Sequence, residues 1–187
     1  IAQQDGIKAA FYGFQDRFRA APGDYGAAVT NISGVGTACN GSGNGNNNGQ
    51  IEKSNGEYVM VWDHLSKAGF INGSFTCTGA SGTQATDTNP TNPYSMYLVM
   101  IYDGVYADTA TPATKHNLKT GNQIPADLLA EVDRKIDDGI PDRGSFRFSA
   151  HTALTTGTEP DPTKCITATS GTTPGVWKVT GTVENNC

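Results

Sequence analysis

Three carboxylates stand close together late in the chain, in a segment that also carries turn residues. Asp137, Asp138 and Asp142 lie within the segment 137–144, which follows an expected helix. Carboxylate oxygens are the ligands that Ca²⁺ prefers, so this segment could chelate a cation. The same side chains could instead accept hydrogen bonds from the turn amides, with Gly139 ending the helix. The sequence leaves both interpretations open.

A second candidate for cation binding is the Asn- and Gly-rich segment that precedes Ile51. Asn44, Asn46 and Asn48 occupy positions 1, 3 and 5 of an EF-hand-type loop, and a glycine and Gln50 follow them. Alternate oxygen-bearing side chains of this kind can turn towards a hard cation. However, all three are neutral amides, and position 12 lacks the usual Glu. The alternative is an Asn-Gly turn whose residues tolerate left-handed backbone conformations.

No catalytic motif is recognisable in the chain. His64, His116 and His151 are far apart in the sequence, and the zinc-protease, serine-hydrolase, P-loop and dinucleotide-binding motifs do not occur. His64 follows Asp63 on an expected helix, where adjacent side chains point to different faces and cannot pair as base and orienting group. We therefore expect that the protein is not an enzyme.

The four cysteines are widely spaced and contain no C-x-x-C pair, which argues against a zinc ribbon or a redox motif. Three disulfide pairings are possible. We predict Cys39–Cys77 with Cys165–Cys187, because each bridge then closes a Gly-, Thr- and Asn-rich stretch that lacks core residues. Paired cysteines in a loop-rich, acidic chain favour the periplasm, the cell surface or the exterior.

Helical periodicity predicts three elements that would position these residues. The first covers residues 1–19 and ends before Pro22; it starts without an N-cap, and we interpret it as the lower half of a longer helix. Its apolar stripe consists of Ile7, Phe11, Phe14 and Phe18.

The second helix follows Ser54, which has capping-box spacing to Glu57. The third starts near Pro125 and ends at Gly139. Its expected apolar face consists of Leu128, Leu129, Val132 and Ile136. Apolar runs and alternation predict strands over 94–102, 144–150 and 176–183. This order of elements favours an α+β fold with a small antiparallel sheet.

Composition limits the classes of protein that this chain can belong to. Its 187 residues suit one domain, and hydrophobic residues at 36% and charged residues at 17% indicate a thin core with long loops. The net charge of −5 argues against a nucleic-acid-binding surface. No apolar run is long enough to span a membrane.

Four segments, in the same order, resemble segments of the type IV pilins and pseudopilins. They are FQDRFRAAPGDY at 14–25, GNGNNNGQI at 43–51, WDHLSKAGFING at 62–73 and VDRKIDDGIPDRG at 132–144. The resemblance implies a pilin-like fold, in which a long N-terminal helix packs on a small antiparallel sheet with additional helices and long loops. Residues 1–21 would be the lower half of that helix, and residues 22–187 would form the single globular domain.

The resemblance implies a structural subunit of a type IV pilus or of a related type II secretion-like or adhesion filament. Its partners would be copies of itself and other pilin-like subunits. A processing site and an apolar half-helix, absent from these residues, would anchor the precursor in the inner membrane, facing the periplasm. After assembly the subunit would be extracellular. Some pseudopilins bind Ca²⁺ in a loop near the sheet, which makes Ca²⁺ a possible ligand of either candidate segment.

A second hypothesis is a secreted or cell-surface glycan-binding or adhesin module that calcium would stabilise. Tyrosine rings can stack on sugars while their hydroxyl groups form hydrogen bonds. The tyrosines that could do so are Tyr94, Tyr97, Tyr102 and Tyr106.

Overall fold

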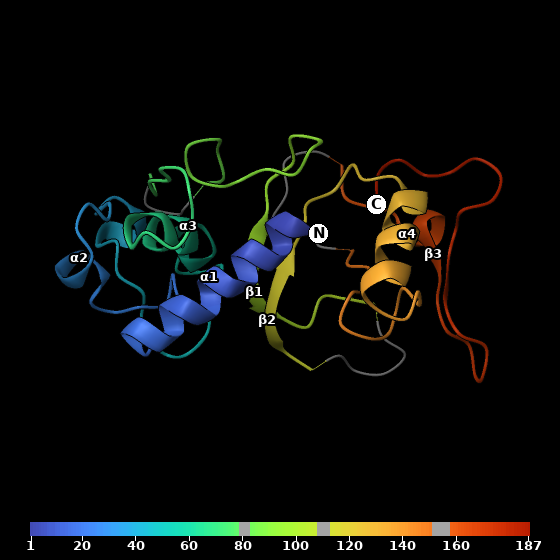
Figure 1. Ribbon diagram of the computed structural model, residues 1–187, viewed down its shortest axis with the longest axis horizontal. Coiled ribbons are helices and arrows are strands. Elements are labelled where there is room, and N and C mark those ends of the chain that lie inside the picture. Colours follow the sequence, from blue (N-terminus) through green and yellow to red (C-terminus); the bar gives the residue numbers. More distant parts are fainter. Residues whose placement is uncertain (79–82, 108–112, 151–157) are drawn as a thin grey trace. The chain divides into compact units, whose positions relative to one another are not determined.

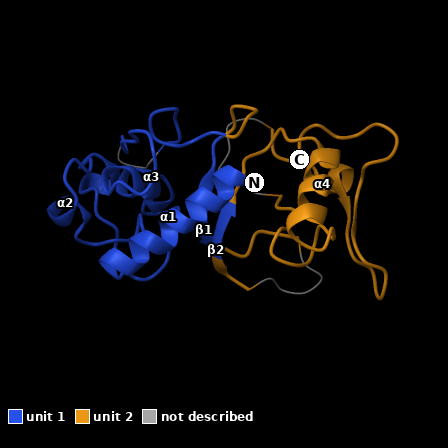
Figure 2. Cartoon of the chain, in the orientation of Figure 1, with its two compact units in different colours: residues 1–91, 97–102, 116–118 blue, residues 92–96, 103–115, 119–187 orange. Residues whose placement is uncertain are grey.

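The structure is a computed structural model, and it describes residues 1–78, 83–107, 113–150 and 158–187. These residues divide into two compact units (Figure 2). Unit 1 comprises Ile1–Thr91, Tyr97–Tyr102 and His116–Leu118, and unit 2 comprises Asn92–Met96, Asp103–Lys115 and Lys119–Cys187. Each unit contains its own buried apolar residues, so each is described by itself.

Helix α1 (Ala2–Phe18) opens unit 1 and corresponds to the helix expected over residues 1–19. Its apolar stripe faces inward, because Ile7, Phe11 and Phe14 are buried. Phe18, at the last turn, is half-buried, and its ring lies tilted against that of Phe14 with centroids 4.5 Å apart. The helix ends where Arg19 adopts the left-handed conformation, with φ 57°.

Helix α3 (Glu57–Lys67) packs against α1 inside unit 1. Its N-cap is Gly56, which has a φ of 69° and no capping side chain. The predicted capping box from Ser54 to Glu57 is therefore wrong. The Glu57 carboxylate is occupied elsewhere, since it accepts hydrogen bonds from the backbone amides of Asn46 and Glu52.

The remaining elements of unit 1 are short. They are α2 (Ala28–Asn31), a 3-10 turn at Cys39–Gly41, and most of the two-stranded sheet that β1 (Val99–Asp103) forms with β2 (Lys115–Lys119). The strand expected over 94–102 is thus extended only in its second half. Figure 1 shows α1 beside this sheet, and the Phe11 ring lies 5.6 Å from that of His116 on β2. Phe14 lies instead against α3, with its ring stacked over His64.

Unit 2 is built around helix α4 (Ala126–Ile136), α5 (Pro162–Cys165) and a second two-stranded sheet. In this sheet β3 (Ile166–Thr167) and β4 (Val176–Trp177) are antiparallel, with Ile166 opposite Trp177. The predicted strand over 144–150 is wrong, because these residues form turns and irregular backbone. Phe148 is nevertheless buried, packed edge-on against the ring of Trp177. The strand expected over 176–183 is limited to its first two residues.

The buried face of α4 also differs from the expected one. Leu129 is buried as predicted, but Leu128 and Ile136 are 40% and 38% exposed. The face that packs inward centres on two alanines and Asp133, which lies one turn after Leu129. Residues four positions apart lie on the same face of a helix, so Leu129 and Asp133 face inward together. The prediction did not place this face correctly because it counted only apolar residues.

The coarse α+β class, with an N-terminal helix and small antiparallel sheets, is confirmed. Among the described helices, none has the length and apolar character needed to cross a membrane.

Candidate functional site

The disulfides of the structure follow the sequential pairing. Cys39 and Cys77 are joined in unit 1, and Cys165 and Cys187 are joined in unit 2, with Cα atoms 5.5 and 5.8 Å apart. Each bridge thus fixes a loop-rich part of one unit. Cross-links of this kind stabilise a thin-cored chain mainly by restricting its unfolded state.

The Asn-rich loop uses its side chains to make its own turns. The amide oxygen of Asn46 accepts from the Asn48 amide at 3.0 Å, and that of Asn48 accepts from the Gln50 amide at 2.8 Å. Asn44 accepts from the amide of Val29 at 2.9 Å. These oxygens are engaged by backbone N–H groups, as the turn interpretation requires.

The side-chain nitrogens of the same loop converge on one acid. Asn46 and Asn48 each donate to Glu52 Oε2 at 2.8 Å, and Asn55 donates to the same atom at 3.0 Å. Positions 3, 5 and 12 of the EF-hand pattern therefore meet at position 9, Glu52. The groups that meet there are N–H donors, which bind a carboxylate and do not coordinate a cation.

Two buried carboxylates hold the loop from inside unit 1. Asp24 accepts from the amides of Asn48 and Gly49 at 3.0 and 2.8 Å, and Glu57 accepts from those of Asn46 and Glu52 at 3.0 and 2.9 Å. Burial raises the pKa of Glu57 from 4.5 to about 7, and the negative charges nearby add to this. Burial also raises the pKa of Asp24.

His64 joins three of the segments that carry the resemblance. Its Nδ1 accepts from the amide of Gly23 at 2.9 Å, and its Nε2 lies 3.0 Å from the carbonyl oxygen of Gly43. The ring is therefore the neutral tautomer with the proton on Nε2. Burial lowers the pKa of His64 to about 4. Gly23 is required here, because a Cβ on it would lie 2.5 Å from the carbonyl oxygen of Glu57.

In unit 2, the predicted acidic segment gathers a different set of carboxylates. Asp133, Asp137 and Asp138 bring one oxygen each within 4.8 Å of one another at the end of α4. Asp142 is not among them: its Oδ1 accepts from the hydroxyl group of Thr169 at 2.9 Å. The predicted grouping of Asp142 with Asp137 and Asp138 is therefore wrong, because Asp142 is buried against the loop before β4.

Hydrogen-bond donors already bind all three carboxylates, and Asp138 accepts from the amide of Ile140 at 2.9 Å. Asp133 accepts from the Trp177 indole at 2.7 Å and from the amide of Gly139 at 3.2 Å, and Asp137 accepts from the amides of Ser145 and Phe146. Burial raises the pKa of Asp133, the two donors to it lower that pKa, and the neighbouring carboxylates raise it further. A cation could join this cluster, which has the ligand type that suits Ca²⁺.

Sequence reasoning missed Asp133, Asp24, Glu52 and Glu57 as site residues. Only Asp133 gave a usable signal, since it lies one helical turn before Asp137 on a predicted helix. Asp24 accepts from amides 24 and 25 residues later in the sequence, and no local pattern marks such a contact. Glu52 and Glu57 bind groups within 11 residues, but they lie outside positions 1, 3 and 5 of the EF-hand pattern.

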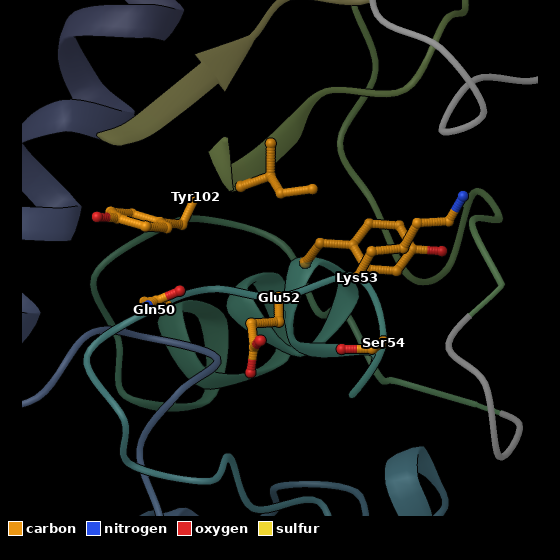
Figure 3. A pocket seen from close by; sticks show the side chains of 7 residues that line it. Gln50, Glu52, Lys53, Ser54 and Tyr102 are labelled. Atoms are coloured by element: carbon orange, nitrogen blue, oxygen red, sulfur yellow. The ribbon is translucent and has the colours of Figure 1, made fainter. Parts of the chain in front are cut away.

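The candidate aromatic residues are divided between the two units. Tyr97 and Tyr102 belong to unit 1, while Tyr94 and Tyr106 belong to unit 2. Of these four, Tyr102 lines a pocket of about 580 Å³, which also includes Tyr58 on α3 and the polar residues 50 and 52–54 (Figure 3). His116 packs beside Tyr102, and His151 lies outside the described residues.

No family model, no curated protein and no solved structure matches the chain.

Proposed function

We propose that this chain is a non-enzymatic subunit of a type IV pilus or of a related secretion or adhesion filament. It would act by assembling with copies of itself and with similar subunits. The observation that carries the proposal is the two-sided character of α1. One face is buried through Ile7, Phe11 and Phe14, while Tyr12 on the opposite face is 67% exposed. That second face is available to a neighbouring subunit.

The contacts made by the four resembling segments support a structural role. Gly23, Gly43 and His64 belong to three of these segments, and they are bonded to one another through the imidazole ring. In the fourth segment, Asp137 binds backbone amides just beyond the segment's end. Side chains that bind backbone amides position turns and helix ends, so the shared residues serve packing rather than a reaction.

The environment of His64 also supports a role without catalysis. Both ring nitrogens bind backbone atoms, and the ring is buried. A general base must reach a substrate proton within hydrogen-bonding distance. His64 does not meet this condition, because its ring is buried and both of its nitrogens are engaged. His116 is packed against the rings of Phe11 and Tyr102.

In the proposed role, an apolar continuation of α1 anchors the precursor in the inner membrane with the globular part in the periplasm. After assembly, the same segment packs in the filament core. The exposed face of α1 then contacts neighbouring subunits, and the loops of both units face solvent.

The proposal is tested by a charge placed on the exposed face of α1 in the full-length protein in its source organism. We expect Tyr12→Asp to abolish filaments seen by electron microscopy while the globular part keeps its melting temperature. Tyr94→Asp, which alters a tyrosine that is 40% exposed in unit 2, is the matched control and should leave filaments intact. Normal filaments containing the Tyr12→Asp subunit would contradict the proposal.

A further inference from the structure

We propose that the pocket of unit 1 binds a neutral carbohydrate of one or two sugar rings. Its volume of about 580 Å³ lies within the range of small-ligand sites. This inference goes beyond the filament role and does not depend on it. The argument rests on the lining of the pocket, on the rigidity of that lining and on its charge.

The lining combines the two kinds of surface that a sugar presents. Tyr58, Ile101 and Tyr102 supply apolar and aromatic area, which suits the C–H faces of a pyranose ring. Gln50 and Glu52 supply planar amide and carboxylate groups, which suit the hydroxyl groups at the ring edge. Figure 3 shows Tyr102 and Gln50 on one side, Lys53 and Ser54 on the other, and Glu52 between them.

Glu52 is held in place before any ligand arrives. Its Oε2 accepts hydrogen bonds from the side chains of Asn46, Asn48 and Asn55 at 2.8, 2.8 and 3.0 Å. No residue in the described part of the chain donates to its Oε1. A carboxylate fixed through one oxygen presents the other to a hydroxyl group at little entropic cost.

The backbone around Glu52 is fixed as well. The amide of Tyr102 donates to the carbonyl oxygen of Ile51 at 2.9 Å, which ties the loop to β1. The Glu52 amide donates to the buried carboxylate of Glu57 at 2.9 Å, which ties the loop to α3. The loop that carries Glu52 is therefore held at a fixed distance from β1 and from α3. A pocket that is fixed in this way binds a small rigid ligand at a lower entropic cost.

The charge of the lining favours a neutral sugar. Glu52 and Lys53 are adjacent and of opposite sign, so the lining has no excess of either charge. A phosphate or carboxylate ligand would need several donors without a nearby acid. A purely apolar ligand would leave the polar groups of the rim without partners, at a cost in binding free energy.

Saturation-transfer NMR and calorimetric titration of the chain test the inference, with D-glucose, D-galactose, N-acetyl-D-glucosamine, cellobiose and lactose as probes. We expect at least one probe to bind with a Kd of about 1 mM or tighter. Tyr102→Ala and Gln50→Ala should each weaken binding about tenfold, and Tyr12→Ala, on the exposed face of α1, should not. Gln50 is exposed, so its variant keeps the test valid even if Tyr102→Ala does not fold.

The proposal is overturned if no probe binds at concentrations up to about 10 mM. It is also overturned if Gln50→Ala binds as tightly as the wild type, because the ligand then lies elsewhere. Tighter binding of glucuronate than of glucose would overturn the assignment of a neutral ligand.

Discussion

The imidazole Nδ1 of His64 accepts a hydrogen bond of 2.9 Å from the backbone amide of Gly23, forty-one residues earlier in the chain. The opposite ring nitrogen lies 3.0 Å from the carbonyl oxygen of Gly43. One buried side chain thus fixes the turn after α1, the Asn-rich loop and helix α3 in a single arrangement. The hydrogen bond from the Gly23 amide requires a neutral imidazole, so the stability of the protein depends on pH.

The stability of the protein should fall in acid because of His64. Its pKa is lowered from 6.5 to about 4 in the folded state, so the unfolded state takes up a proton first. The stabilising contribution is complete above pH 6.5 and is lost as the pH falls towards 4, at a cost on the order of 3 kcal/mol. Urea unfolding between pH 4 and pH 8 measures this slope. His64→Gln should reduce the slope while lowering stability at pH 7 by about 1–3 kcal/mol. An unchanged slope in this variant would refute the assignment.

Glu57 should act in the opposite direction. Burial raises its pKa from 4.5 to about 7, so the folded state holds a proton that the unfolded state has released. Its contribution is present below pH 4.5 and is lost as the pH rises through 7. In Glu57→Gln, the unfolding free energy should depend less on pH across this window, relative to the wild type. Lys53→Gln, at an exposed position nearby, is the control, and its unfolding free energy should depend on pH as strongly as that of the wild type.

The indole of Trp177 should be the main stabilising partner of Asp133. Trp177→Phe keeps most of the ring but removes the donor at 2.7 Å from a buried carboxylate. We expect a loss of about 1–3 kcal/mol in the unfolding free energy, measured by chemical denaturation. Asp138→Asn alters an exposed member of the same cluster and should change stability by less than about 0.5 kcal/mol. Equal effects of the two variants would mean that the indole contact contributes nothing specific.

Calcium binding remains a prediction for both candidate segments, and variants separate them. In the Asn-rich loop, the side-chain amide oxygens of Asn46 and Asn48 already accept hydrogen bonds from backbone N–H groups. In the acidic cluster, Asp133, Asp137 and Asp138 bring carboxylate oxygens close together. We therefore expect calcium to raise the melting temperature through the acidic cluster. Asp137→Asn should remove the shift, and Asn46→Ala should retain it. No shift on adding calcium or chelator would exclude both segments as tight sites.

Local patterns predicted the positions of α1, α3 and α4, but not the short helices α2 and α5. The apolar stripe from Ile7 to Phe14 predicted α1, and Pro125, near which the third helix was predicted to start, is the N-cap of α4. Four-residue periodicity is a property of the helix itself, and proline restricts the backbone wherever it occurs. The coarse α+β class followed from the order of these elements. Two short sheets are present where a single one was expected, and Phe148 is buried by packing on Trp177 rather than in a strand.

The candidate sites were less predictable because they depend on long-range contacts. Glu57 was expected to cap its own helix, and it binds the amide of Asn46 instead. Asp142 was expected to join Asp137, and it binds the loop around Thr169 instead. In both cases the sequence identified a carboxylate that requires hydrogen-bond donors, but the tertiary structure determined which donors it binds. A buried acid with a distant partner leaves no local signature.

The gene sequence immediately upstream of the Ile1 codon tests the central proposal most directly. A filament subunit requires that α1 continue into about 20 predominantly apolar residues, preceded by a prepilin-type cleavage site. We predict that this segment is present and that mass spectrometry of the native protein finds its cleaved N-terminus. A polar upstream sequence, or a secretory signal cleaved just before Ile1, would contradict the assignment to a pilin-like filament.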